Sequence, residues 1–124
     1  MNTNQVNPNL TDFEKSVILE ANTERPYTGE YNNFYKEGNY TCRNCGNLLY
    51  SSKAKFDAGC GWPAFDSCYV NSINYYQEYD GRVEITCKNC QGHLGHVFVG
   101  EQLTEKNTRH CVNSASITFV KKEF

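Results

Sequence analysis

The fold of this 124-residue chain is decided by Cys42-Arg43-Asn44-Cys45 and by its counterpart Cys87-Lys88-Asn89-Cys90. Each stretch is a CxxC turn that brings two sulfur atoms together, and two such turns complete a tetrahedral site of four thiolates. The 41 residues between Cys45 and Cys87 exceed the gap of an ordinary zinc ribbon, so we expect the metal to join strands that are distant in sequence. We predict one structural Zn²⁺ bound by the four cysteines.

A CxxC pair can instead be a redox dithiol, as in thioredoxin-like folds. That motif requires a helix starting at its first cysteine within a βαβ unit, and neither pattern surrounds these pairs. Four thiolates leave no open coordination position on the metal. We therefore expect the zinc to stabilise the fold and to take no part in catalysis.

The composition indicates one mainly β domain. Nine Tyr and seven Phe favour strands, because aromatic rings suit half-buried pleated surfaces. The polar residues 1–9 predict a flexible tail, and residues 10–124 predict a single domain. The formal charge of -2 argues against a nucleic-acid surface, and no apolar run reaches the length of a membrane span. We expect a cytoplasmic, monomeric protein whose thiols remain reduced.

Local signals place one helix and several strands. Thr11 and Glu14 form a capping box, which predicts a short amphipathic helix over residues 12–22. Asp80-Gly81 predicts a two-residue type I′ turn in a β-hairpin. The strands are expected at 39–42, 48–51, 72–79, 82–87, 96–99 and 114–120, with a loop over 52–68.

Zinc leaves three cysteines unexplained: Cys60, Cys68 and Cys111. Cys111 follows Arg109 and His110, and a thiol with cationic and imidazole neighbours is typical of a reactive thiolate. On a strand the side chain of His110 points away from that of Cys111, which makes His110 the better candidate for a structural histidine. The chain therefore reads as a cysteine-based enzyme built around a structural metal.

Two further motifs carry candidate chemistry. Cys60 lies between two glycines, which let the backbone bend as a moving thiol requires. Trp62, the single tryptophan, either offers a face to a small apolar or sulfur-bearing group or anchors its loop in the core. His93 and His96 are acid/base candidates, because no carboxylate lies close in sequence to complete a second metal site.

Taken together, these motifs resemble the B-type methionine sulfoxide reductases, which act on the R epimer of methionine sulfoxide. Two positions depart from the family pattern: Ala64 stands where Ser is frequent, and His110 where an aromatic residue is usual. The resemblance covers Leu10 to Phe119. It rests on both CxxC turns and on the blocks Pro26-Tyr27-Thr28-Gly29-Glu30-Tyr31, Gly59-Cys60-Gly61-Trp62-Pro63, Gly92-His93-Leu94-Gly95-His96-Val97-Phe98 and Arg109-His110-Cys111-Val112-Asn113-Ser114-Ala115.

The resemblance implies two antiparallel sheets with peripheral helices and a peptide-methionine (R)-S-oxide reductase activity. It implies that Cys111 is the nucleophile and Cys60 the resolving cysteine, with a disulfide between them that thioredoxin reduces. A sulfoxide sulfur becomes electrophilic when its oxygen is protonated or strongly hydrogen-bonded, and His96 is the expected acid. The sulfenic acid left on Cys111 would then condense with a thiol.

The resemblance also implies the substrate contacts. Trp62 would hold the methyl group of the substrate, while His93 and Asn113 would join His96 in organising the pocket around the sulfoxide oxygen. Arg109, turned toward Cys111, would favour its thiolate electrostatically.

Two other functions remain open at this level. Paired CxxC turns are common in zinc-ribbon binding modules, which recognise nucleic acid or protein without catalysis. A thiol peroxidase or redox sensor would use the same sulfenic acid chemistry without a methionine pocket.

Overall fold

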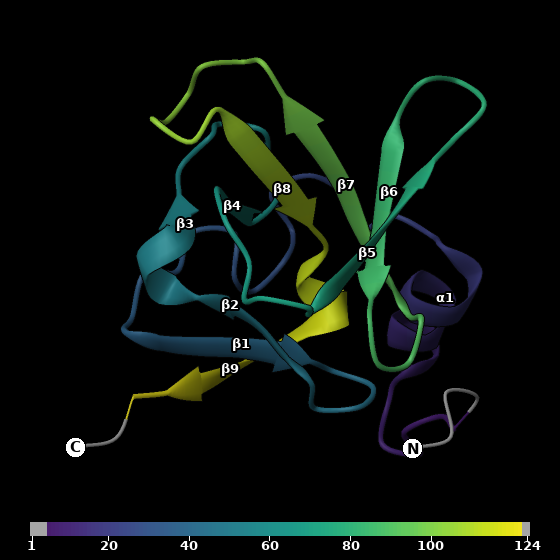
Figure 1. Cartoon of the computed structure of the whole chain (residues 1–124). Coiled ribbons are helices and arrows are strands. Elements are labelled where there is room, and N and C mark those ends of the chain that lie inside the picture. Colours follow the sequence, from purple (N-terminus) through teal and green to yellow (C-terminus); the bar gives the residue numbers. More distant parts are fainter. Residues whose placement is uncertain (1–4, 123–124) are drawn as a thin grey trace.

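The computed structural model describes residues 5–122, which form two antiparallel sheets and one α-helix (Figure 1). The predicted fold class is confirmed. The smaller sheet has the order β2-β1-β9, with β1 at Gly38–Cys42, β2 at Leu48–Ser51 and β9 at Ile117–Lys121. The larger sheet has the order β3-β4-β8-β7-β6-β5, with strands at Lys55–Phe56, Ala64–Phe65, Ile73–Gln77, Val83–Cys87, His93–Val99 and Thr108–Val112 for β3 to β8 respectively.

The two sheets pack through aromatic rings. Tyr50 of β2 stacks on Phe65 of β4, with ring centroids 4.2 Å apart and planes 13° apart. Tyr40 of β1 meets the same Phe65 edge-on at 5.1 Å. All three rings are fully buried. The abundance of aromatic residues therefore serves the contact between sheets, where large rings fill the space between two pleated surfaces.

Helix α1 (Asp12–Glu20) lies beside β7 and begins with the predicted capping box. The side chain of Thr11 accepts the N–H of Glu14 (3.1 Å), and the carboxylate of Glu14 accepts the N–H of Thr11 (2.9 Å). The helix ends two residues earlier than predicted, because Ala21 adopts a left-handed backbone conformation with φ 58°. Its buried face consists of Val17 and Ile18.

The β5–β6 hairpin corrects one turn prediction. The strands end at Gln77 and resume at Val83, and Glu78 donates its N–H to the carbonyl of Arg82 (2.7 Å). Only Gly81 of the connection has a positive φ, at 93°, whereas a type I′ turn requires positive φ at both central residues. The connection is therefore a longer loop with glycine in the left-handed position.

Three other predicted ranges differ in detail. The predicted loop over 52–68 contains a 3₁₀ helix, η1 (Ser52–Ala54), and the short strands β3 and β4. The strand predicted at 96–99 begins at His93. The strand predicted at 114–120 begins as a second 3₁₀ helix, η2 (Ser114–Ser116), before β9 starts at Ile117.

The described part of the predicted tail lies against the first CxxC turn. Asn7 donates its backbone N–H to the side chain of Asn44 (2.8 Å) and its side-chain amide to the carbonyl of Arg43 (3.0 Å). Residues 1–4 lie outside the described residues, so the domain boundary at residue 10 stays a prediction. No helix within residues 5–122 is long and apolar enough to cross a membrane.

Candidate active site and metal centre

The four CxxC cysteines converge in space. Their Sγ atoms all lie within 4.8 Å of one another, with Cys42 and Cys90 3.6 Å apart and Cys45 and Cys87 3.6 Å apart. Tetrahedral zinc with Zn–S bonds of about 2.3 Å separates its sulfur ligands by about 3.8 Å, so this donor set fits Zn²⁺. Cys42 ends β1 and Cys87 ends β6, which means that the cluster ties the two sheets together, as the long gap between the turns predicts.

Six of the seven predicted catalytic and substrate-binding residues line one cavity of about 210 Å³. The exception is His93, which is buried behind the cavity wall. A larger cavity of about 600 Å³ lies beside β1 and η1. None of the seven predicted residues lines it, so we do not assign it to the predicted reaction. The six residues that line the smaller cavity are Cys60, Trp62, His96, Arg109, Cys111 and Asn113.

Cys111 occupies the middle of the larger sheet. Its strand β8 runs between β4 and β7, and Cys111 pairs with Ala64 on one side and with His96 on the other. Paired residues of antiparallel strands project to the same face, so His96 stands beside the thiol. Ala64, one of the two departures from the family pattern, is buried directly opposite Cys111.

His110 points to the opposite face, as strand alternation predicts. It is buried in the aromatic core, where its Nδ1 lies 2.9 Å from the hydroxyl of Tyr50. Burial lowers the pKa of His110 to about 4. The histidine is therefore a neutral core residue and belongs to the contact between the sheets.

Cys60 faces Cys111 from a loop shaped by glycines. Gly59 and Gly61 have φ values of 68° and 95°, which side chains other than glycine rarely adopt. The Cys60 thiol lies 3.4 Å from the carbonyl oxygen of Trp62 and forms a hydrogen bond with the thiol of Cys111. The structure thus brings together the two cysteines that the resemblance pairs.

The two thiols share one negative charge. The hydrogen bond from Cys111, aided by the charge of Arg109, lowers the pKa of Cys60 to about 6. The same hydrogen bond and burial raise the pKa of Cys111 above its usual range. The pair therefore loses its first proton more readily than an ordinary thiol and keeps its second more firmly.

Cys68 lies outside this arrangement. It does not line the cavity, and its thiol lies 3.6 Å from the hydroxyl of Tyr75 on the edge strand β5. Of the two cysteines that the sequence leaves as partners for Cys111, only Cys60 is in contact with it.

His96, the predicted acid, and His93, predicted to help organise the pocket, both bind carboxylates from the β5–β6 hairpin. Nε2 of His96 lies 2.7 Å from a carboxylate oxygen of Glu78, and Nδ1 of His93 lies 2.6 Å from one of Glu84. A carboxylate on one ring nitrogen fixes the orientation of an imidazole. The two rings are 5.8 Å apart, with His96 in the cavity wall and His93 behind it. Burial lowers the pKa of His93.

Arg109 turns its guanidinium into the cavity. It binds both carboxylate oxygens of Glu101 (2.8 and 3.1 Å) and lies over the ring of Phe98, 4.4 Å from the centroid. Because its charge also acts on Cys60 and Cys111, it stabilises the single thiolate of the pair.

Trp62 and Asn113 are fixed by backbone groups. The indole Nε1 of Trp62 donates to the carbonyl of Glu24 (3.0 Å), which leaves the ring free to line the cavity. Trp62 is half-buried, so it lines the cavity and is not a core anchor. The amide of Asn113 donates to the carbonyl of Leu94 (3.0 Å) and accepts the N–H of Glu24 (3.0 Å). Its side chain thus holds neighbouring backbone segments in place.

The sequence did not point to several residues that complete the site. Glu78 lies 18 positions from His96 and Glu84 lies nine positions from His93, and the folding of the β5–β6 hairpin beside β7 brings each carboxylate to its histidine. Gly95 lies so close to β8 that a Cβ there would overlap the carbonyl oxygen of Cys111. One hint of these carboxylates was visible in the sequence: acidic residues recur at even positions along the β5–β6 hairpin and so share one face of it.

A search of solved structures relates the fold to the crystal structure of the Mis18 'Yippee-like' domain. The TM-score is 0.55 and the identity 14%, over 72% of this chain and 100% of that chain. At this identity the match shows a shared fold alone.

The sequence comparisons are more specific. A family model described as the SelR domain matches residues 10–121. Peptide methionine sulfoxide reductase B5 of Oryza sativa subsp. japonica is 59% identical over 112 residues, covering 89% of this chain and 82% of its own length. Peptide methionine sulfoxide reductase 2 of Saccharomyces cerevisiae is 50% identical over 124 residues, covering 93% of this chain and 74% of its own length. The chain belongs to the SelR domain family, whose relatives include these peptide methionine sulfoxide reductases.

Proposed function

We propose that this chain reduces the R epimer of methionine sulfoxide, free or in proteins, to methionine. The family membership supports the reaction. The observation that carries the mechanism is the contact between the thiols of Cys60 and Cys111 in a cavity that His96 also lines.

In the first step Cys111 passes its proton to the thiolate of Cys60, and the resulting Cys111 thiolate attacks the sulfur of the sulfoxide. His96, oriented by its hydrogen bond to Glu78, donates a proton to the sulfoxide oxygen. The attack forms a bond between the two sulfurs. The oxygen then moves to the sulfur of Cys111, where an S–O bond forms as the sulfur–sulfur bond and the sulfur–oxygen bond of the substrate break. The substrate sulfur is reduced by two electrons, methionine leaves, and Cys111 becomes a sulfenic acid.

In the second step Cys60 attacks the sulfenic sulfur, a disulfide forms and water leaves. The structure gives a reason for this division of labour. Cys111 lies on a central strand between two neighbours, where it is fixed for a directed attack. Cys60 lies on a loop between two glycines, whose backbone can change conformation more readily than a strand.

The choice of epimer follows from three contacts around the substrate sulfur. Cys111 defines the direction of attack, Trp62 receives the methyl group, and His96 receives the oxygen. The S epimer exchanges methyl and oxygen and leaves a buried donor facing a methyl group, which costs about 1–3 kcal/mol for each unpaired group.

The proposal also covers the reductant that regenerates the enzyme, its oligomeric state, its location and its metal. Thioredoxin reduces the Cys60–Cys111 disulfide by thiol–disulfide exchange, and the protein acts as a monomer in the cytoplasm. Zinc, held by Cys42, Cys45, Cys87 and Cys90, supplies folding free energy. A non-catalytic zinc-binding module would leave the thiol pair and its cavity without a use.

Thioredoxin-coupled NADPH consumption with separated epimers tests the proposal. We expect turnover with the R epimer, little with the S epimer, and less with peroxide than with the R epimer. Cys111→Ser should lower turnover to background even with a small dithiol as reductant, because a hydroxyl is a poor nucleophile without a dedicated base. Cys68→Ser is the matched control and should keep wild-type turnover. Equal rates on both epimers would contradict the proposal.

A further inference from the structure

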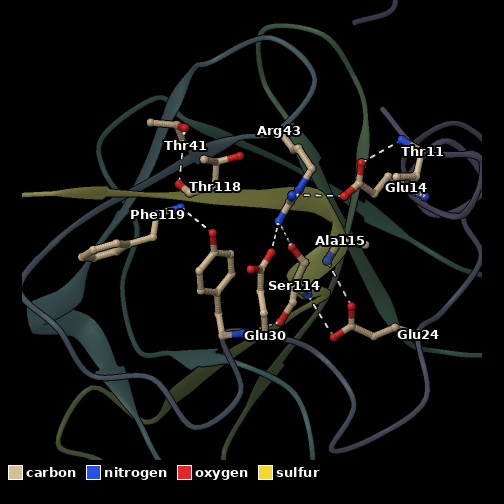
Figure 2. Close-up of polar contacts among 11 residues, drawn as sticks. Thr11, Glu14, Glu24, Glu30, Thr41, Arg43, Ser114, Ala115, Thr118 and Phe119 are labelled. Atoms are coloured by element: carbon tan, nitrogen blue, oxygen red, sulfur yellow. Dashed lines mark hydrogen bonds and ion pairs between the residues drawn. The ribbon is translucent and has the colours of Figure 1, made fainter. Parts of the chain in front are cut away.

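Glu24 is a buried carboxylate outside the predicted site that hydrogen-bonds the segment of Ser114 and Ala115 (Figure 2). Its side chain is directed at the turn that follows Cys111. One carboxylate oxygen accepts the backbone N–H of Ser114 (3.0 Å) and the other accepts that of Ala115 (3.0 Å). Two backbone donors of η2 are thereby satisfied by one side chain.

The backbone of Glu24 holds the opposite wall of the cavity. Its carbonyl accepts the indole N–H of Trp62 (3.0 Å), and its N–H donates to the side chain of Asn113 (3.0 Å). Trp62 and the Cys111 turn come from different parts of the chain and belong to different segments of the cavity wall. Glu24 is the residue that bonds to both.

The surroundings are shaped around this carboxylate. Gly29 packs against it so closely that a Cβ there would overlap both the carboxylate of Glu24 and the side chain of Ser114. On the other side, Arg43 donates to the carbonyl of Ser114 (3.0 Å), and Figure 2 shows it also reaching Glu14 and Glu30. The turn is therefore held at its N–H groups by Glu24 and at a carbonyl by Arg43.

We infer that Glu24 is a positioning residue for sulfoxide reduction, fixing the separation between the Trp62 ring and the Cys111 thiol. The inference rests on the proposed function. Trp62 receives the methyl group and Cys111 attacks the sulfur, and in the substrate these two atoms are directly bonded. A change in the separation of the two walls therefore misplaces the sulfur relative to the thiol.

Glu24→Gln tests this role with a nearly isosteric change. An amide accepts one of the two N–H groups and presents its own N–H to the other, so one end of the turn is released. A displacement of about 1 Å at a reacting centre can cost about 100-fold in rate. We expect kcat/KM for the R epimer to fall by about that factor and the preference for the R epimer to narrow.

Two readouts do not depend on turnover. Trp62 is the only tryptophan, so intrinsic fluorescence reports on its surroundings alone. In Glu24→Gln we expect emission shifted to the red and stronger quenching by acrylamide. We also expect a changed rate of Cys111 alkylation, followed by peptide mass spectrometry.

Glu30→Gln is the matched control. Glu30 belongs to the same segment and binds Arg43 (2.7 Å), but no described contact joins it to Trp62 or to the Cys111 turn. It should keep the wild-type emission, alkylation rate and epimer preference. Glu24→Asp provides a second variant if Glu24→Gln does not fold, since it keeps the charge but is too short to reach both N–H groups.

A folded Glu24 variant with wild-type emission, Cys111 alkylation and epimer preference would overturn the inference. Equal effects in Glu30→Gln would also overturn it, because they would reflect general loosening of the network. If the wild-type protein reduces no sulfoxide, the proposed function fails, while fluorescence and alkylation still decide whether Glu24 positions the two walls.

Discussion

The metal cluster and the thiol pair use cysteine in opposite ways. The four CxxC cysteines sit on tight turns at the ends of β1 and β6, and their sulfurs lie close enough for a closed site. Cys60 and Cys111 instead combine a flexible glycine loop with a central strand, around an open cavity of about 210 Å³. The cluster joins the sheets, whereas the pair lies on one face of the larger sheet.

The difference lies in what surrounds each sulfur. A structural site satisfies every ligand and leaves no room for a substrate. The thiol pair keeps one exchangeable proton, one cationic neighbour and one histidine beside an open space. We therefore expect substitutions in the four CxxC cysteines to impair folding, and substitutions of Cys60 or Cys111 to impair the reaction.

Removing the metal should have the largest effect. Structural zinc sites contribute on the order of 10 kcal/mol to folding, so chelation or Cys90→Ser should abolish the cooperative unfolding transition. Cys60→Ser should leave that transition in place. Elemental analysis and thermal denaturation check this. Well-folded, active protein without metal would contradict the view that the four CxxC cysteines are needed for folding.

Two glycines offer a smaller test. A Cβ at Gly95 would overlap the carbonyl oxygen of Cys111, and a backbone atom in a central strand cannot move aside. We expect Gly95→Ala to lower the free energy of unfolding by about 3 kcal/mol, the upper range for overpacking. Gly46, in the first CxxC turn, has φ 80° and open space around it, so Gly46→Ala should cost about 1 kcal/mol.

Urea denaturation of the two alanine variants gives both numbers. The order of the two values is the decisive result, because it contrasts a tightly packed strand of the candidate site with an open turn beside the candidate metal cluster. A Gly46→Ala variant less stable than Gly95→Ala would contradict the close approach of β7 and β8.

A further expected effect, smaller than that of Gly95→Ala, concerns pH. Burial lowers the pKa of His110 to about 4 from an ordinary value of 6.5. As pH falls below 6.5 the unfolded chain binds a proton that the folded protein does not, so the stability contributed above that pH is lost. Between pH 7 and pH 5 the loss from this residue is about 2 kcal/mol.

His110→Phe should remove this component. It keeps a ring at the position and has no titratable group, so its unfolding free energy should fall less than that of the wild type between pH 7 and pH 5. Chemical denaturation at the two pH values checks the difference. Parallel losses in the two proteins would show that His110 is not buried as a neutral residue.

Signals carried by neighbouring residues predicted the fold best. The CxxC spacing predicted the metal cluster, and the Thr11–Glu14 capping box predicted the start of α1. Both depend on chemistry within a few positions of the chain. The predicted end of α1 and the predicted Asp80-Gly81 turn were wrong, because Ala21 ends the helix in a left-handed conformation and five residues, not two, connect β5 and β6.

The candidate site shows the same division. The sequence supplied Cys111, Cys60 and His96, because reactive residue types in a known pattern are visible without a structure. It did not supply Glu24 or Glu78, since a carboxylate that bonds a partner tens of residues away carries no mark of its role in the sequence. Those residues depend on strand register and on the path of the N-terminal segment.

The most direct test of the account is the disulfide formed by substrate. Fully reduced protein is mixed with the R epimer of a methionine sulfoxide peptide without external reductant, and the chain is then digested and mapped by mass spectrometry. We expect one methionine released per chain and Cys60 joined to Cys111, with Cys68 and the four metal-binding cysteines still reduced. A bridge between Cys68 and Cys111, or release of methionine with Cys111 unmodified, would contradict it.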